Sequence, residues 1–191
     1  MNDKLIEKKR YDNLASLLLQ KNKKVVLNQH LDSSQYSDYL NIPTNYYFNL
    51  FKSFKKNLKL LEIGAGTGTN TTKLLDMSFD VCATDISPKS VEVMNKKFSK
   101  YKNFSSKVAD MENLPFKKES FDIICSSGSL SYGNNDIVIE QIYRLLKPQG
   151  RFVVIDSLNN NPIYKLNRLI HYYKGNRTKS TLVRMPDLNL I

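Results

Sequence analysis

Three glycines at alternate positions, Gly64, Gly66 and Gly68, form the stretch of this sequence best suited to ligand binding. An apolar run that contains Glu62 precedes them, and a helix-forming run begins at Thr69. This order predicts a buried strand, a turn without side chains and a helix start. Such a turn lets a ligand lie against bare backbone at the positive end of the helix, so the expected chemistry is the binding of an anion or a nucleotide.

Two carboxylates follow later predicted strands in the same way. Asp85 ends a strand roughly twenty residues after the glycine turn, where a carboxylate can hold the hydroxyl groups of a ribose. Asp110 follows the next strand and can accept a hydrogen bond from an adenine amine, while Ile86 and Met111 offer apolar surface to the ring. Because ligands of open α/β sheets bind at the carboxyl ends of the strands, these residues predict an adenosine site.

The spacing of the glycines indicates which adenosine compound the site would bind. A dinucleotide fingerprint is G-x-G-x-x-G, whereas the third glycine here comes one residue early, and the turn lacks the lysine and Ser/Thr of a phosphate loop. Glu62 would repel a pyrophosphate and could lie near an ammonium group. A cationic adenosine compound without phosphates fits better, and S-adenosylmethionine is one.

Alternating strands and helices position these residues. Strands are predicted at residues 58–63, 79–84, 104–109, 121–126 and 151–156, and helices at 69–76, 88–100 and 135–146. Apolar strands separated by helices indicate an α/β fold with a parallel sheet covered on both faces.

The regions outside the sheet are predicted to be helical. Leucine and isoleucine residues give residues 3–20 an amphipathic pattern, namely Leu5, Ile6, Leu14, Leu17 and Leu18. Residues 21–41 are expected to be a loop with a short helix. A further helix should follow Pro43, where the face of Tyr47 either packs on the sheet or, with Tyr46, roofs a ligand pocket. The tail should open with a helix over 162–173. These patterns divide the chain into a helical extension (1–57), a cofactor-binding core (58–157) and a helical tail (158–191).

Five motifs, in the right order and spacing, resemble those of class I S-adenosylmethionine-dependent methyltransferases, and the small-molecule, type 11-like branch is the most similar. They are Glu62-Ile63-Gly64-Ala65-Gly66, Thr84-Asp85-Ile86-Ser87, Ala109-Asp110-Met111-Glu112-Asn113-Leu114-Pro115-Phe116, Ser120-Phe121-Asp122-Ile123-Ile124 and Leu145-Leu146-Lys147-Pro148-Gln149-Gly150-Arg151-Phe152. The resemblance covers residues 58–157 and implies a Rossmann-like doubly wound parallel sheet with strand order 3-2-1-4-5.

The resemblance also implies which residues bind S-adenosylmethionine. The methionine end would meet Glu62, Gly64, Ala65, Gly66 and Ser126. Asp85 would hold the ribose hydroxyls, with Ile86 against the adenine, and Asp110 and Met111 would bind the adenine edge.

The acceptor side is less defined. Methyl transfer from a sulfonium is an in-line displacement, and a hydroxyl acceptor calls for a general base. The candidates are His171, after the fifth strand, and Tyr132, in the loop after the fourth. The tail from Asn161 to Pro186 resembles methyltransferases of bacterial surface-polysaccharide biosynthesis, which implies a hydroxyl of a sugar or nucleotide-sugar as acceptor. Its arginines would suit a phosphate group on that acceptor, namely Arg168, Arg177 and Arg184.

Two departures from the family stand out. Class I methyltransferases usually end with a strand pair, one strand antiparallel, and no strand is predicted here after the fifth, so that pair is expected to be missing. Gln149 stands where the family usually has the first residue of a Gly-Gly turn, and the turn should tolerate it.

Composition limits the remaining alternatives. A length of 191 residues suits one domain, and no apolar run approaches the roughly 20 residues of a membrane span. The start of the chain lacks a secretory signal pattern, so a cytoplasmic location is expected. Cys82 and Cys125 lie in predicted strands without ligand-spaced neighbours, which indicates packing rather than a metal site. The net charge of +11 leaves RNA as an alternative acceptor. The lysines and arginines are spread along the chain, however, and form no arginine-rich patch in the sequence. A shortened, non-catalytic binding protein is the third alternative.

Overall fold

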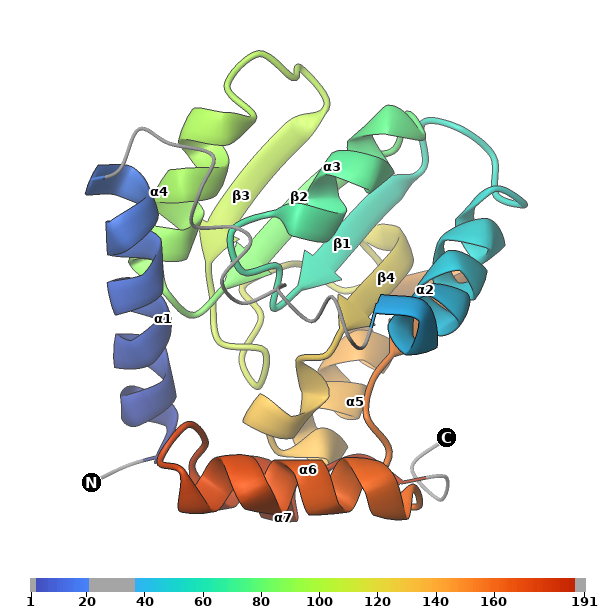
Figure 1. Cartoon of the computed structure of the whole chain (residues 1–191). Helices are drawn as coiled ribbons and strands as arrows, with labels where there is room; N and C mark the ends of the chain where they lie inside the picture. Colours follow the sequence, from blue (N-terminus) through green and yellow to red (C-terminus); the bar gives the residue numbers. More distant parts are fainter. Residues whose placement is uncertain (1–2, 21–36, 188–191) are drawn as a thin grey trace.

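The computed structural model describes residues 3–20 and 37–187, and its centre is a five-stranded sheet (Figure 1). The strands are β1 (Lys59–Ile63), β2 (Asp80–Asp85), β3 (Phe104–Val108), β4 (Phe121–Ser127) and β5 (Leu146–Ile155). Their order is β3-β2-β1-β4-β5, and all four pairings are parallel. This arrangement confirms the predicted Rossmann-like doubly wound sheet and its strand order.

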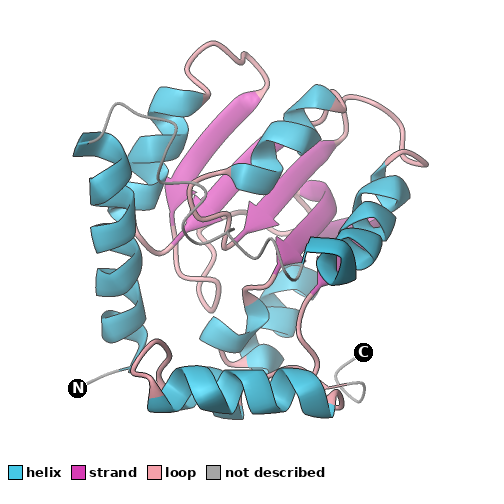
Figure 2. Ribbon diagram, in the orientation of Figure 1, coloured by secondary structure: helices cyan, strands magenta, loops and turns pink. Residues whose placement is uncertain are grey.

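Helices cover both faces of the sheet (Figure 2). The buried side chains of β1 alternate between two apolar clusters because successive strand residues point to opposite faces. Leu60 belongs to a cluster with residues of α2 (Ser37–Phe51), α3 (Thr69–Asp76) and α4 (Pro88–Lys97). Leu61 belongs to a second cluster, to which α5 (Asn135–Leu145) contributes. The two clusters hold the carboxyl ends of the strands at one edge of a rigid core.

The first helix, α1 (Asp3–Gln20), forms where predicted but does not dock through its apolar residues. Leu5, Ile6 and Leu17 are 59%, 39% and 44% exposed, whereas Glu7 and Ala15 are buried. The helix lies beside α4 (Figure 1). The face that contacts the rest of the protein is therefore mainly polar, so the apolar pattern of residues 3–20 does not mark the contact face of this helix.

The second helix begins earlier than predicted, at Ser37, and contains Pro43. A proline inside a helix removes one backbone hydrogen bond and costs about 3 kcal/mol. The following turns bury Tyr47, Phe48 and Phe51 in the core, and this packing offsets that cost. Tyr47 therefore packs on the sheet, as one of the two alternatives predicted, while Tyr46 is exposed. The short helix expected within residues 21–41 falls largely on residues 21–36, outside the described residues.

The tail crosses one end of the molecule below α5 (Figure 1). It consists of α6 (Pro162–Tyr173), as predicted, and a short helix that was not predicted, α7 (Lys179–Val183). The side-chain oxygen of Asn161 caps α6 by accepting hydrogen bonds from the backbone N–H groups of Ile163 and Tyr164. In the described part of the chain, no strand follows β5. No helix among the described residues has the length and apolar character needed to cross a membrane.

A strained residue lies near the start of β5. Gln149 has a φ of 65°, in the left-handed region that favours glycine. The register of β4 and β5 shifts between Phe121 and Ile123, so the backbone bulges at this point. The glycine that the family usually has there would adopt this φ without a Cβ clash.

We expect Gln149→Gly to stabilise the protein by about 1 kcal/mol, because the substitution removes the Cβ that penalises a left-handed backbone. Urea unfolding would measure the change. Gln149→Ala is the matched control, since alanine keeps the Cβ and should give no comparable gain. Equal stability of the glycine and alanine variants would contradict this explanation.

Candidate functional site

A cleft opens at the carboxyl ends of β1, β2, β3 and β4, where the sequence predicted an adenosine site. Seven of the predicted site residues line it: Gly64, Gly66, Asp85, Ile86, Asp110, Met111 and Tyr132. Three more predicted residues, Glu62, Ala65 and Ser126, lie on or directly after strands that reach the cleft but do not line it. The structure therefore brings together most of the residues that the resemblance singled out.

The glycine turn between β1 and α3 forms one wall of the cleft. Gly64 and Gly66 have φ values of 65° and 58°, both left-handed. A Cβ built on Gly64 would lie 2.5 Å from the Cβ of Ser129, whereas one on Gly66 would meet nothing within 4 Å. The turn is thus closely packed at its first glycine and open to the cleft at its second.

The carboxylate of Asp85 holds this turn in place. Its Oδ2 accepts a hydrogen bond from the Gly66 N–H at 2.8 Å, and its Oδ1 accepts from the Ser87 N–H at 2.9 Å. Burial raises the pKa of Asp85, and the N–H donors partly offset that effect. Because a carboxylate has about four lone-pair sites, Asp85 can still accept hydrogen bonds from a ligand.

Glu62 lies fully enclosed under the turn. It is 3% exposed, and its Oε2 accepts a hydrogen bond from the Thr71 hydroxyl at 2.6 Å. Burial raises the pKa of Glu62 to about 7, while the bond from Thr71 lowers it in part. The carboxylate of Glu62 therefore hydrogen-bonds Thr71 of α3 and does not line the cleft.

Asp110 and Met111 follow β3 and line the cleft. Asp110 Oδ1 accepts from the Glu112 N–H at 3.0 Å. Its Oδ2 forms an ion pair of 2.7 Å with Lys4 Nζ, which also lies 2.8 Å from Glu112. A residue of α1 thus shares the carboxylate predicted to recognise an adenine amine.

The contribution of α1 is the main feature that the sequence interpretation missed. Lys4, Glu7 and Tyr11 all line the cleft. Asp12 accepts a hydrogen bond of 2.6 Å from the Ser87 hydroxyl and so joins α1 to the start of α4. Polar residues spaced by three and four positions fall on one helix face, and this spacing could have indicated a polar contact face.

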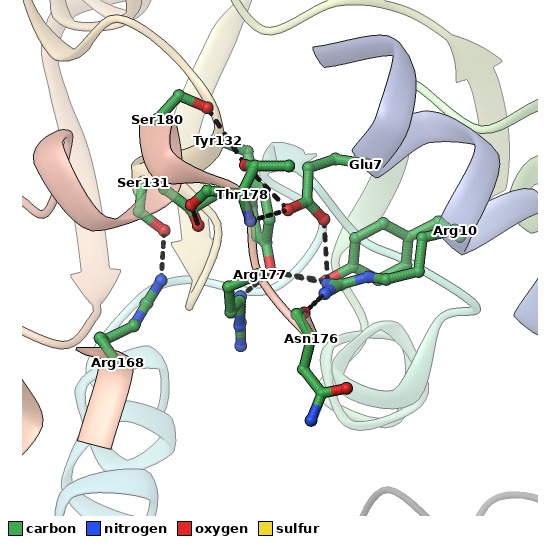
Figure 3. Close-up of polar contacts among 11 residues, drawn as sticks. Glu7, Arg10, Ser131, Tyr132, Arg168, Asn176, Arg177, Thr178 and Ser180 are labelled. Carbon is green, nitrogen blue, oxygen red and sulfur yellow. Dashed lines mark hydrogen bonds and ion pairs between the residues drawn. The ribbon is translucent and has the colours of Figure 1, made fainter. Parts of the chain in front are cut away.

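The hydroxyl of Tyr132, after β4, is a meeting point of polar side chains (Figure 3). The Tyr11 hydroxyl donates to it at 2.8 Å, and Arg10 Nη2 lies 3.3 Å away. Arg177 Nη1 also donates to this oxygen. The neighbouring Ser131, in the short helix η1 (Leu130–Tyr132), accepts from Arg168 Nη1 at 2.9 Å.

His171 and Ser126, which were also predicted, do not line the cleft. His171 is half-buried on α6 and does not line the cleft, and burial together with Arg177, Lys174 and Arg168 lowers its pKa. Its position gives no support to a role as general base. Ser126 is buried, and its hydroxyl hydrogen-bonds that of Ser129 at 2.6 Å.

Comparison with known protein families places the chain among methyltransferases. A model of the methyltransferase domain matches residues 54–183, which include the sheet and most of the tail. The chain therefore belongs to the methyltransferase domain family. One relative is the sterol 4-C-methyltransferase strm-1 of Caenorhabditis elegans, 31% identical over 139 residues that make up 70% of this chain and 41% of that protein. The chain spans about half the length of the curated relatives it matches.

Solved structures share the fold. YcgJ from Bacillus subtilis superposes with a TM-score of 0.64 and 22% identity, over 76% of this chain and 64% of that one. Geranyl diphosphate C-methyltransferase from Streptomyces coelicolor has a TM-score of 0.59 and 16% identity, over 75% and 58% of the two chains. Its structure contains Mg²⁺, geranyl diphosphate and S-adenosylhomocysteine. At these identities the likeness shows that the fold is shared.

The two glycines of the turn should respond differently to alanine. Both substitutions place a Cβ on a left-handed residue, at a cost of about 1–2 kcal/mol each. Only Gly64→Ala also meets Ser129, which adds about 1–3 kcal/mol of overpacking. We expect Gly66→Ala to have the higher Tm and yet to bind S-adenosylhomocysteine weakly, because its methyl group enters the cleft. Equal Tm values, or full binding by Gly66→Ala, would contradict this geometry.

The raised pKa of Glu62 makes its effect on stability depend on pH. Between the ordinary value of 4.5 and about 7, the folded protein keeps a proton that the unfolded chain has lost. The folded state therefore loses stability as the pH rises through this window. Glu62→Gln removes the effect, so its free energy of unfolding relative to wild type should rise by on the order of 3 kcal/mol from pH 4.5 to pH 8.

Urea unfolding at both pH values would measure this change. Glu140→Gln, at an exposed position on α5, serves as the matched control and should show no such dependence. A Glu62→Gln difference that stays constant with pH would show that Glu62 ionises normally in the folded protein.

Proposed function

We propose that this protein binds S-adenosylmethionine in the cleft and transfers its methyl group to a small-molecule acceptor, at a hydroxyl group of a sugar or a related metabolite. The observation that carries the proposal is the contact between Asp85 and Gly66. It joins the carboxylate at the end of β2 to the glycine turn after β1. A carboxylate at this strand end, beside a turn of bare backbone, is placed to hold ribose hydroxyls.

The residues present suit this cofactor. The open space at Gly66 leaves room for a ligand against the turn, and Asp85 can accept further hydrogen bonds from ribose hydroxyls. Ile86 and Met111 line the same cleft and offer apolar surface to an adenine. No lysine of a phosphate loop is present in the turn, which agrees with a ligand without phosphates.

When bound, S-adenosylmethionine supplies an electrophilic methyl group on a positively charged sulfur. The chain's own task is then to align an acceptor with that group and to exclude water, which are the contributions that positioning makes to a displacement. Tyr132 lines the cleft beyond the glycine turn, and we assign its hydroxyl the role of orienting the acceptor hydroxyl.

The sugar acceptor rests on the resemblance of the tail to methyltransferases of polysaccharide biosynthesis. This proposal is supported by two contacts of the tail near the Tyr132 end of the cleft, Arg168 with Ser131 and Arg177 with Tyr132. A small-molecule acceptor also agrees with the relatives named above, which are a sterol and a geranyl diphosphate methyltransferase by name.

The proposal predicts that the protein binds S-adenosylhomocysteine and transfers labelled methyl groups from S-adenosylmethionine to a sugar or nucleotide-sugar. Asp85→Ala should weaken S-adenosylhomocysteine binding at least tenfold, since hydrogen bonds to a charged group are worth about 1.5–3 kcal/mol. Calorimetry would measure the affinity, and far-UV circular dichroism would confirm that the variant folds.

Asp80→Ala is the matched control, because Asp80 lies exposed at the opposite end of the same strand. It should leave the affinity unchanged. Failure of the wild-type protein to bind S-adenosylhomocysteine would refute the proposed function. Binding without methyl transfer to any sugar would refute the acceptor while keeping the cofactor.

A further inference from the structure

Arginine side chains from distant parts of the chain converge at the Tyr132 end of the cleft (Figure 3). Arg10 comes from α1, Arg168 from α6, and Arg177 from the connection between α6 and α7. Arg10 and Arg177 both donate to the Tyr132 hydroxyl, and Tyr132 lines the cleft. The guanidinium groups therefore reach the wall of the cleft rather than a remote surface.

The cluster holds more hydrogen-bond donors than acceptors. The Tyr11 hydroxyl also donates to Tyr132, so three donors share one phenol oxygen that has two lone pairs. Arg10 Nη1 donates to the Asn176 carbonyl, and Arg10 Nη2 pairs with Glu7 Oε2, which is buried and forms no hydrogen bond among the described residues. Arg10 Nε is also buried and has no hydrogen-bond partner among the described residues. A buried donor without an acceptor is costly. The arrangement thus lacks an acceptor that offers several oxygen atoms.

The charges of the cluster are not balanced either. Glu7 pairs with Arg10 at 3.1 Å and also accepts from Thr178, and Asp156 lies 3.8 Å from Arg168. Within residues 3–20 and 37–187, no carboxylate lies within ion-pair distance of Arg177. Burial and the nearby charge of Arg177 lower the pKa of Arg168, as expected where positive charge is in excess.

We propose that Arg10 and Arg177, at the Tyr132 end of the cleft, bind an oxyanion carried by the acceptor, either a phosphate or a carboxylate. This inference rests on the proposed function, because it takes the Tyr132 end of the cleft as the place of the acceptor. Arginine forks match the oxygen atoms of such groups in bidentate geometry. The substrate class narrows accordingly to acidic small molecules, such as a sugar phosphate, a nucleotide-sugar or a sugar acid.

The remaining arginines have other roles. Arg168 is buried and donates to Ser131, so it positions η1 and with it Tyr132. Arg184, which the sequence also suggested for a phosphate group, lies 3.8 Å from Glu112 and donates nothing to the Tyr132 hydroxyl. The proposed oxyanion site therefore uses one arginine from the helix before the sheet and one from the tail.

Titration of inorganic phosphate and, separately, of acetate into the protein saturated with S-adenosylhomocysteine tests this inference. The NMR signal of the Arg10 Nε–H group reports binding directly. We expect one or both anions to shift this signal, and the tighter of the two identifies the group that the acceptor carries. Arg177→Gln should weaken the binding at least about tenfold, whereas Arg151→Gln, at an exposed position on β5, should leave it unchanged.

Three results would overturn the inference. They are no binding of either anion, equal binding by Arg177→Gln and wild type, and equal weakening by Arg151→Gln. A separate comparison tests whether the cluster instead holds the carboxylate of the cofactor. If so, S-adenosylhomocysteine would abolish anion binding, and Arg177→Gln would weaken its affinity without affecting that of 5′-methylthioadenosine, which lacks the carboxylate.

The two proposals fail separately. A wild-type protein that does not bind S-adenosylhomocysteine contradicts the proposed function. Phosphate and acetate can still be titrated into the protein alone, so the oxyanion site would be tested in that case too. Circular dichroism and Tm of Arg177→Gln distinguish a loss of binding from a loss of the fold.

Discussion

The rest of the site depends on the hydrogen bonds that the carboxylate of Asp85 accepts. Through Gly66 it fixes the glycine turn, and through Ser87 it fixes the start of α4. Ser87 in turn caps α4 and donates to Asp12 of α1. One buried, hydrogen-bonded carboxylate thus sets the relative positions of two strand ends and two helices around the cleft. Burying this charge is tolerable only because backbone N–H groups satisfy it.

The helix α1 joins the core and the tail around the same cleft. Asp12 connects it to α4, Lys4 to Asp110, and Glu7 to Thr178 at the start of α7. Such contacts depend on geometry and charge more than on apolar area, so they specify one arrangement of the helix. They also bring Arg10 of α1 to the hydroxyl of Tyr132. This contact could not be read from the family motifs, because Arg10 lies outside them.

The resemblance to class I methyltransferases implied the strand order, and the predicted cleft residues that follow β1, β2 and β3 could be found because their patterns are local. A strand followed by a glycine turn, or by Asp85 or Asp110, implies its place at the carboxyl edge once the sheet is parallel. The contacts of α1 could not be predicted, because they join residues far apart in the chain. The start of α2 before Pro43 was missed for a related reason, as tertiary packing outweighed a local helix-breaking preference. His171 follows the fifth strand as expected, yet on α6 it does not line the cleft.

A crystal structure of the protein with S-adenosylhomocysteine tests the central claim most directly. The account predicts the ribose hydroxyls on the carboxylate of Asp85, the adenine between Ile86 and Met111, and the sulfur facing Tyr132. A ligand bound away from the glycine turn, or a ribose beyond hydrogen-bonding distance of Asp85, would contradict it.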